Sequence, residues 1–89
     1  MQDVRTIGGY GPWSPTCDQV QRRLQMRCLS AIAYVYLGPA HPLWRTLRAG
    51  ETDPMAYVQA QDLVEALPAL VRRKLLSTFM RVTWPRAPP

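Results

Sequence analysis

Proline and glycine divide the chain into short blocks, and this punctuation limits what the sequence can fold into. The breaks are Ser14-Pro15, Gly38-Pro39, Gly50, Pro54 and Pro68. Proline is favoured at the first helical position and glycine just after the last turn. Between the breaks, apolar residues recur at helical spacing, and no block alternates like a strand. The sequence therefore predicts an all-α fold, a small orthogonal bundle of four to five helices around a single core.

The longest block predicts a helix of about twenty residues that starts after Ser14 and ends at Gly38-Pro39. Serine is a preferred N-cap, and Pro15 would be the first helical residue. Apolar residues at steps of four, four, three and four predict a buried face of Val20, Leu24, Cys28, Ala31 and Val35. Further apolar residues widen this face: Leu29, Ile32 and Tyr36. The solvent side is assigned to Gln21, Arg22, Arg23, Gln25 and Arg27.

A second helix is predicted within HPLWRTLRAG, residues 41–50. Pro42 would lie in its first turn and Gly50 would follow its last turn. The residues expected to point inward are Leu43, Trp44 and Leu47. His41, the one histidine of the chain, is expected to face solvent or to cap this helix.

A third helix is predicted in TDPMAYVQAQ and beyond, capped by Thr52 or Asp53, with Pro54 as its first residue. Asp62 and Glu65 have the spacing of a capping box. This spacing leaves open that the helix breaks and restarts near Asp62.

Pro68 either opens a last helix or kinks a continuous one, because proline deep inside a helix costs about 3 kcal/mol. The inner face predicted beyond it consists of Val71, Leu75, Phe79 and Val82, flanked by Leu67, Leu70 and Thr78. Trp84-Pro85 would end this helix. Leu76 and Met80 lie one turn apart, about 100° from the inner face. They either complete a wide core face or form a candidate interface for self-association.

A length of 89 residues fits one domain. We expect an extended lead-in over residues 1–12, a helical domain over 13–84 and a proline-rich tail over 85–89. Trp13, Trp44 and Trp84 lie at the edges of the helical blocks, where large rings suit the ends of a small core. Trp13 is therefore expected to close over the first helix.

Charge is segregated along the chain, whose net charge is +5. Residues 1–48 and 72–89 are basic, whereas residues 49–71 contain four acids and no base. This pattern predicts either pairing between helices of one molecule or head-to-tail self-association. The candidate polyanion contacts are Arg22, Arg23, Arg27, Arg72, Arg73, Lys74 and Arg81. Such residues suit the phosphates of nucleic acid or an anionic membrane surface.

No pattern typical of catalysis is present. Nucleophilic catalysis needs a base beside the nucleophile, and neither Cys17 nor Cys28 has a histidine near it in sequence. If both cysteines lie on the first helix, about 16 Å separates them, which is too far for a disulfide, so we expect reduced thiols. We expect no enzyme activity, no small-molecule substrate, no cofactor and no metal site.

Localisation is inferred from two sequence features. The first residues lack the apolar core of a signal peptide, and no run approaches about 18 apolar residues. We therefore expect an intracellular protein, cytoplasmic or nuclear, without a transmembrane segment.

Two stretches resemble one known family. IGGYGPWSPTCDQVQRRL resembles the opening of retroviral Gag capsid domains, where an apolar, glycine-rich lead and an aromatic residue precede Ser/Thr-Pro and an amphipathic helix. YLGPAHPLW is similar to an interhelical turn of avian-type retroviral capsids. The major homology region and the zinc knuckle are absent, so the resemblance implies a small basic Gag-like or matrix-like module rather than a complete capsid. Such a module would have a structural assembly role at a membrane or with nucleic acid.

Two functions are consistent with these observations. The first is a non-enzymatic helical interaction or assembly module that acts through a protein partner or through self-association. The alternative is a basic domain that binds a polyanion, nucleic acid or an anionic membrane surface, through its last helix.

Overall fold

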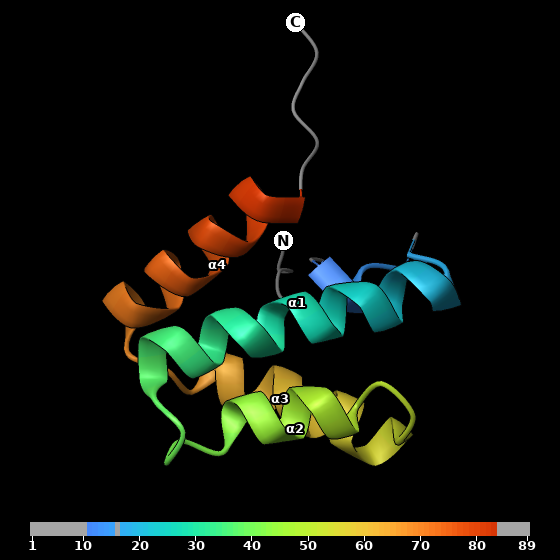
Figure 1. The fold of residues 1–89 in the computed structure, drawn as a ribbon, viewed down its shortest axis with the longest axis horizontal. Helices are drawn as coiled ribbons and strands as arrows, with labels where there is room; N and C mark the ends of the chain where they lie inside the picture. Colours follow the sequence, from blue (N-terminus) through green and yellow to red (C-terminus); the bar gives the residue numbers. More distant parts are fainter. Residues whose placement is uncertain (1–10, 16, 84–89) are drawn as a thin grey trace, which may run out of the picture.

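The computed structural model describes residues 11–15 and 17–83. Its elements are a short 3₁₀ helix η2 (Gly11–Trp13) and the helices α1 (Gln19–Leu37), α2 (Leu43–Ala49), α3 (Pro54–Glu65) and α4 (Ala69–Thr83). The described part of the chain contains no strand. The predicted all-α fold is therefore confirmed, with four α-helices (Figure 1).

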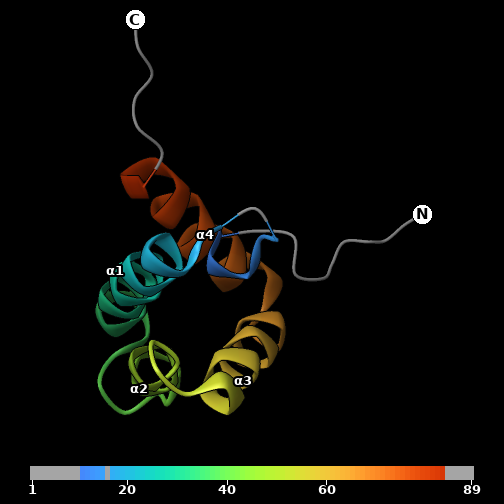
Figure 2. The same cartoon turned by 90° about the vertical axis from the view of Figure 1, so that its right-hand side faces the viewer.

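The long helix α1 runs through the middle of the molecule. Helix α4 lies on one side of it, and α2 and α3 lie on the other (Figure 1). Helix α1 packs against α2, α4 and η2, and α2 packs against α3. Viewed along α1, the four helices surround a common interior, and no other helix covers the outer side of α1 (Figure 2).

Helix α1 begins later than predicted, at Gln19 rather than Pro15. Its N-cap is Asp18, whose carboxylate accepts the Gln21 N–H at 2.8 Å, while the Gln21 side chain accepts the Asp18 N–H at 3.4 Å. This capping box satisfies two backbone donors at once. With Ser14 as the cap, the third residue would be Cys17, which cannot return the second bond. Ser14 instead continues η2 into a turn, in which the Cys17 N–H donates to the Ser14 carbonyl.

The buried face of α1 differs from the predicted one. The buried residues are Met26, Leu29, Ser30 and Ala33. By contrast, Val20, Leu24 and Val35 are 69%, 58% and 76% exposed. Ala31 and Tyr36 are also exposed, and Cys28 and Ile32 are half-buried. Leu29, predicted to widen the buried face, is buried, but most of the predicted face is not. Helix α1 therefore has two apolar faces, and the core uses the one around Met26 and Leu29.

The physical reason for this choice lies in the neighbours of α1. Leu43 and Leu47 of α2 and Leu75 and Phe79 of α4 are buried in the same cluster as Met26 and Leu29. Ser30, which interrupts the apolar pattern on this face, donates its hydroxyl to the Trp44 carbonyl at 2.7 Å. A buried hydroxyl with a partner costs little. The face could therefore enter the core although one of its residues is polar.

The shorter helices follow the sequence more closely. Leu43 and Leu47 are buried and Gly50 follows α2, as predicted. His41 caps this helix, since its Nδ1 accepts the Leu43 N–H at 3.1 Å. In α3, Asp53 is the cap and Pro54 the first residue, and the helix continues through Asp62 without a break.

Helix α4 starts directly after Pro68, so this proline opens a separate last helix. Leu75 and Phe79 are buried, but Val82, predicted to be buried, is exposed. Leu76 packs partly buried against the core, whereas Met80 is exposed. The two residues of the candidate interface therefore do not form one open patch.

Trp13 is buried, as expected, and closes over the core beside α1 and α3. It is 5% exposed, and its indole N–H donates to the Tyr57 carbonyl at 2.9 Å. Gly11 precedes it with φ of 52°, and a Cβ there would lie 2.9 Å from Cε2 of Phe79. Trp84, the proline-rich tail and most of the predicted lead-in lie outside the described residues.

Both cysteines are free thiols, so the expectation of no disulfide is confirmed, although Cys17 precedes α1 rather than lying on it. None of the helices in the described part of the chain has the length and apolar character that crossing a membrane requires.

Candidate functional site

Three of the seven candidate polyanion contacts serve the fold, and Arg22 is the first. Its Nε donates to the Pro12 carbonyl at 3.2 Å and its Nη2 to the Cys17 carbonyl at 3.1 Å. Its guanidinium also lies 5.2 Å from the centre of the Tyr57 ring. Arg22 therefore attaches the segment before α1 to α1 and α3. Its assignment to a solvent-facing polyanion surface is not supported by these contacts.

Arg72 has a similar structural role at the turn between α3 and α4. Its Nη1 donates to the carbonyls of Glu65 and Leu67 at 3.0 and 3.2 Å. Carbonyls at the end of a helix lack partners within the helix. Arg72 therefore caps α3 from the first turn of α4.

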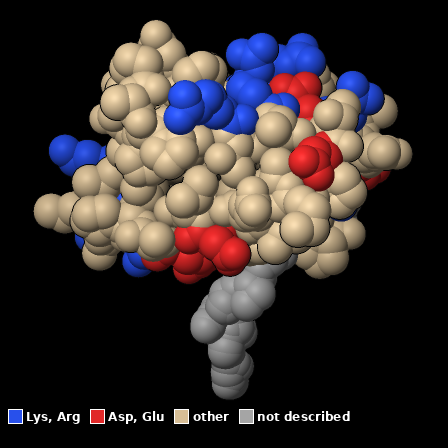
Figure 3. Space-filling view, turned by 90° about the horizontal axis from the view of Figure 1, so that it is seen from below, with Lys and Arg blue, Asp and Glu red and all other residues tan. Residues whose placement is uncertain are grey.

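Arg27 forms an ion pair with Glu51, which lies between α2 and α3. Its Nη2 and Nε donate to the two carboxylate oxygens at 2.8 and 3.3 Å. These hydrogen bonds hold the pKa of Glu51 below its usual value, and the charges of Arg48 and Arg23 act in the same direction. The acidic segment is therefore paired at this point with a basic helix of the same molecule. Figure 3 shows red and blue side chains beside one another on the face seen from below.

The Arg27–Glu51 pair predicts a loss of stability in acid. A carboxyl whose pKa is lowered by folding stabilises the protein above its unfolded pKa, about 4.3 for glutamate, and this contribution disappears as the pH falls through the lower folded pKa. The free energy of unfolding of the unmodified protein should therefore exceed that of Glu51→Gln at neutral pH, and the difference should shrink as the pH falls below about 4.3. Urea unfolding across this range measures both. A difference that does not change with pH would exclude this role for the ion pair.

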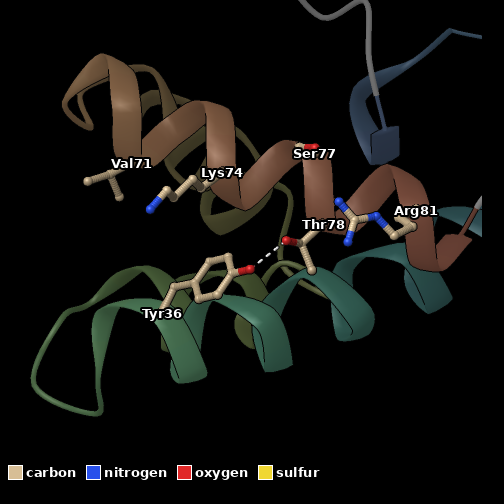
Figure 4. Close-up of a pocket in the computed structure, with 6 residues that line it drawn as sticks. All are labelled: Tyr36, Val71, Lys74, Ser77, Thr78 and Arg81. Atoms are coloured by element: carbon tan, nitrogen blue, oxygen red, sulfur yellow. Dashed lines mark hydrogen bonds between the residues drawn. The ribbon is translucent and has the colours of Figure 1, made fainter.

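The other four candidates, Arg23, Arg73, Lys74 and Arg81, are exposed. Lys74 and Arg81 line a groove of about 500 Å³ between α1 and α4. The remaining lining residues are Tyr36, Val71, Ser77 and Thr78. Figure 4 shows Thr78 between Lys74 and Arg81, with Tyr36 reaching from α1 to Thr78. None of the lining residues is acidic.

This groove was only partly foreseen in the sequence. In the sequence, Lys74 and Arg81 were only two of seven candidate polyanion contacts. The structure groups Arg81 with Lys74, seven residues away, because seven residues make nearly two full turns. Tyr36 and Thr78 were assigned to core faces, yet their hydroxyl oxygens lie 2.6 Å apart in a hydrogen bond at the surface. This hydrogen bond joins two helices that are far apart in the sequence, and the periodicity of either helix alone does not indicate it.

A second surface lies on the outer side of α1. It consists of the apolar residues that the core leaves uncovered: Val20, Leu24, Ala31 and Val35. Beside it, between α1 and α2, is a hollow of about 380 Å³ whose lining includes Ala31, Val35, Tyr34 and Trp44. The Tyr34 ring packs edge-on against Trp44 at 5.2 Å. This outer face of α1 is apolar along most of the helix.

No cluster of three or more metal-ligating side chains occurs among residues 11–15 and 17–83. Burial raises the pKa of the Cys17 and Cys28 thiols above the usual value. Raised pKa values leave less thiolate, the reactive form of cysteine, at neutral pH.

No protein-family model, no curated protein and no solved structure matches the chain. The groove and the outer face of α1 are therefore the features from which a function can be inferred.

Proposed function

We propose that this protein is a non-enzymatic helical assembly module that self-associates through the outer face of α1. The observation that carries the proposal is the exposure of Val20, Leu24 and Val35 along a helix whose opposite face is core. Scattered apolar residues are normal on a surface, but several exposed apolar residues along one side of a helix, here interrupted by Arg27, suit an interaction site.

The spacing of this strip suits a second copy of the same helix. Val20 and Val35 are equally far from the midpoint between Arg27 and Cys28, and so are Leu24 and Ala31. Two α1 helices packed antiparallel about a twofold axis through this midpoint would place each residue opposite its counterpart. Self-complementarity of this kind is what a twofold dimer requires.

Shape and charge favour the same arrangement. Leu24 of one copy would face the small Ala31 of the other, beside the hollow that Tyr34 and Trp44 help to line. Arg27 is the charged residue next to the axis, and its pairing with Glu51 compensates its charge. The ion pair therefore lowers the repulsion between the two copies at the axis, while Arg48 adds a further positive charge to the lining of the hollow.

An assembly role also agrees with the resemblance to Gag-like modules, for which we propose the same kind of non-catalytic, structural function. The chemistry of the described residues points in the same direction. His41 is engaged in capping α2, and both thiols have raised pKa values. Neither arrangement favours a nucleophile or a general base.

Sedimentation velocity of Leu24→Glu tests the proposal. We expect the unmodified protein to associate in the micromolar range and Leu24→Glu to remain folded but monomeric, because a carboxylate would be buried without a partner. Val58→Glu on α3 is the matched control, since Val58 is exposed to nearly the same extent, 55%. A protein that is monomeric even at high micromolar concentration would overturn the proposal.

The antiparallel register has its own test. Leu24→Glu and Ala31→Lys should each weaken association, and the double variant should regain it, because opposite charges would then face each other across the axis. The two positions are two turns apart within one helix, so they pair poorly inside a single copy. Failure of the double variant to recover would contradict this register.

A further inference from the structure

The groove between α1 and α4 is separate from the outer face of α1, and its chemistry is different. Lys74 and Arg81 form no ion pair within residues 11–15 and 17–83. Ser77, Thr78 and Tyr36 add three hydroxyl groups between and beside the two cations. Cations together with hydroxyl donors and no acid are the usual partners of phosphate groups. We propose that this groove binds single-stranded nucleic acid through its phosphates.

The shape of the site favours a strand over a membrane. Lys74 and Arg81 are separated by about 10 Å along the axis of α4, so they can contact different phosphates of one strand. The site is a hollow between two helices, with Thr78 set between the two cations (Figure 4). A flexible strand can enter such a hollow, whereas a bilayer surface meets the most protruding side chains first.

Tyr36 supplies the second element of single-strand recognition. It is 47% exposed, and the hydrogen bond between its hydroxyl group and that of Thr78 holds it at the groove. Exposed aromatic rings beside a basic groove stack on bases without regard to their identity. Binding should therefore be tolerant of sequence and should depend on both the phosphates and the Tyr36 ring.

Fluorescence anisotropy with a labelled oligouridylate of about 12 nucleotides, which lies within the site sizes of single-strand binders, tests the proposal. The logarithm of affinity should fall with the logarithm of salt concentration with a slope of about −1.4, since each of two phosphates contributes about 0.7. Lys74→Gln/Arg81→Gln should weaken binding roughly tenfold at about 50 mM salt and bring the slope close to zero.

The matched control is Arg45→Gln/Arg48→Gln, which removes the same charge from exposed positions on α2. It should leave binding nearly unchanged. Equal weakening by both double variants would show that net charge alone attracts the RNA and would overturn the groove as its site. Circular dichroism checks that each variant remains folded.

Two further measurements complete the test. Tyr36→Ala should weaken binding more than Tyr36→Phe, because only the former removes the stacking surface. Vesicles of phosphatidylcholine and phosphatidylserine, titrated under the same conditions, should bind less tightly than the RNA. Binding to vesicles without binding to RNA would refute the proposal. Neither groove variant should change sedimentation, so this result and the test of self-association remain independent.

Discussion

Replacing Trp13 with alanine should lower the free energy of unfolding by about 3–5 kcal/mol, the usual cost of removing a buried tryptophan side chain. The ring is part of the central cluster and lies 6.3 Å from the Tyr57 ring. Its N–H bond to the Tyr57 carbonyl would also be lost, which leaves a partly buried acceptor without that donor. Small domains are stable by only about 5–15 kcal/mol, so this single change would remove a large share.

Trp13→Phe separates the two contributions. It keeps most of the apolar ring but removes the N–H donor, so its effect should be clearly smaller than that of Trp13→Ala. Urea unfolding followed by circular dichroism measures both variants. An unchanged denaturation midpoint for Trp13→Ala would mean that the segment before α1 does not belong to the core.

Replacing Leu29 with alanine should have a comparable effect. The free energy of unfolding should fall by about 2–5 kcal/mol, because the Leu29 side chain on α1 is fully buried against the neighbouring helices. Leu24→Ala, on the opposite face of the same helix, should change the free energy of unfolding by less than about 0.5 kcal/mol. Both substitutions have the same chemistry and nearly the same helix propensity cost. The difference between them therefore measures which face of α1 is core.

Both variants should be measured at a concentration low enough for the protein to be monomeric, since association stabilises the folded state. Under those conditions a large loss of stability in Leu24→Ala and a small one in Leu29→Ala would contradict the packing of α1. At higher concentration Leu24→Ala should additionally weaken self-association, whereas Leu29→Ala should not.

Much of the helical pattern could be predicted because its causes are local. Pro54 with Asp53 before it, Pro68 and Gly50 each act within one turn of the chain, through a missing N–H, a side-chain cap or the end of a hydrogen-bonded segment. The end of α1 is equally local, since Gly38 adopts φ of 88°, a conformation that favours glycine. The predicted start of α1 was wrong because two possible N-caps lie close together in the sequence. The capping box of Asp18 and Gln21 makes two hydrogen bonds and is therefore favoured over Ser14 followed by Pro15.

The candidate sites were harder to predict because they depend on contacts between distant residues. In the sequence, Arg22 is simply a basic residue on a helix. Its structural role follows from the contacts of its guanidinium with the carbonyls of Pro12 and Cys17 and with the ring of Tyr57. Lys74 and Arg81 line a groove only because α1 packs beside α4 and places Tyr36 next to them.

By itself, the sequence determined the all-helical fold, the extent of α2 and the start of α3, since capping and helical periodicity act locally. Only the tertiary structure decided which face of α1 is core. Two apolar faces were available, and the packing of α2 and α4 buried the one with Met26 and Leu29. The other face, with Val20 and Leu24, was left exposed because burial depends on which helices lie nearby, and periodicity within one helix does not contain that information.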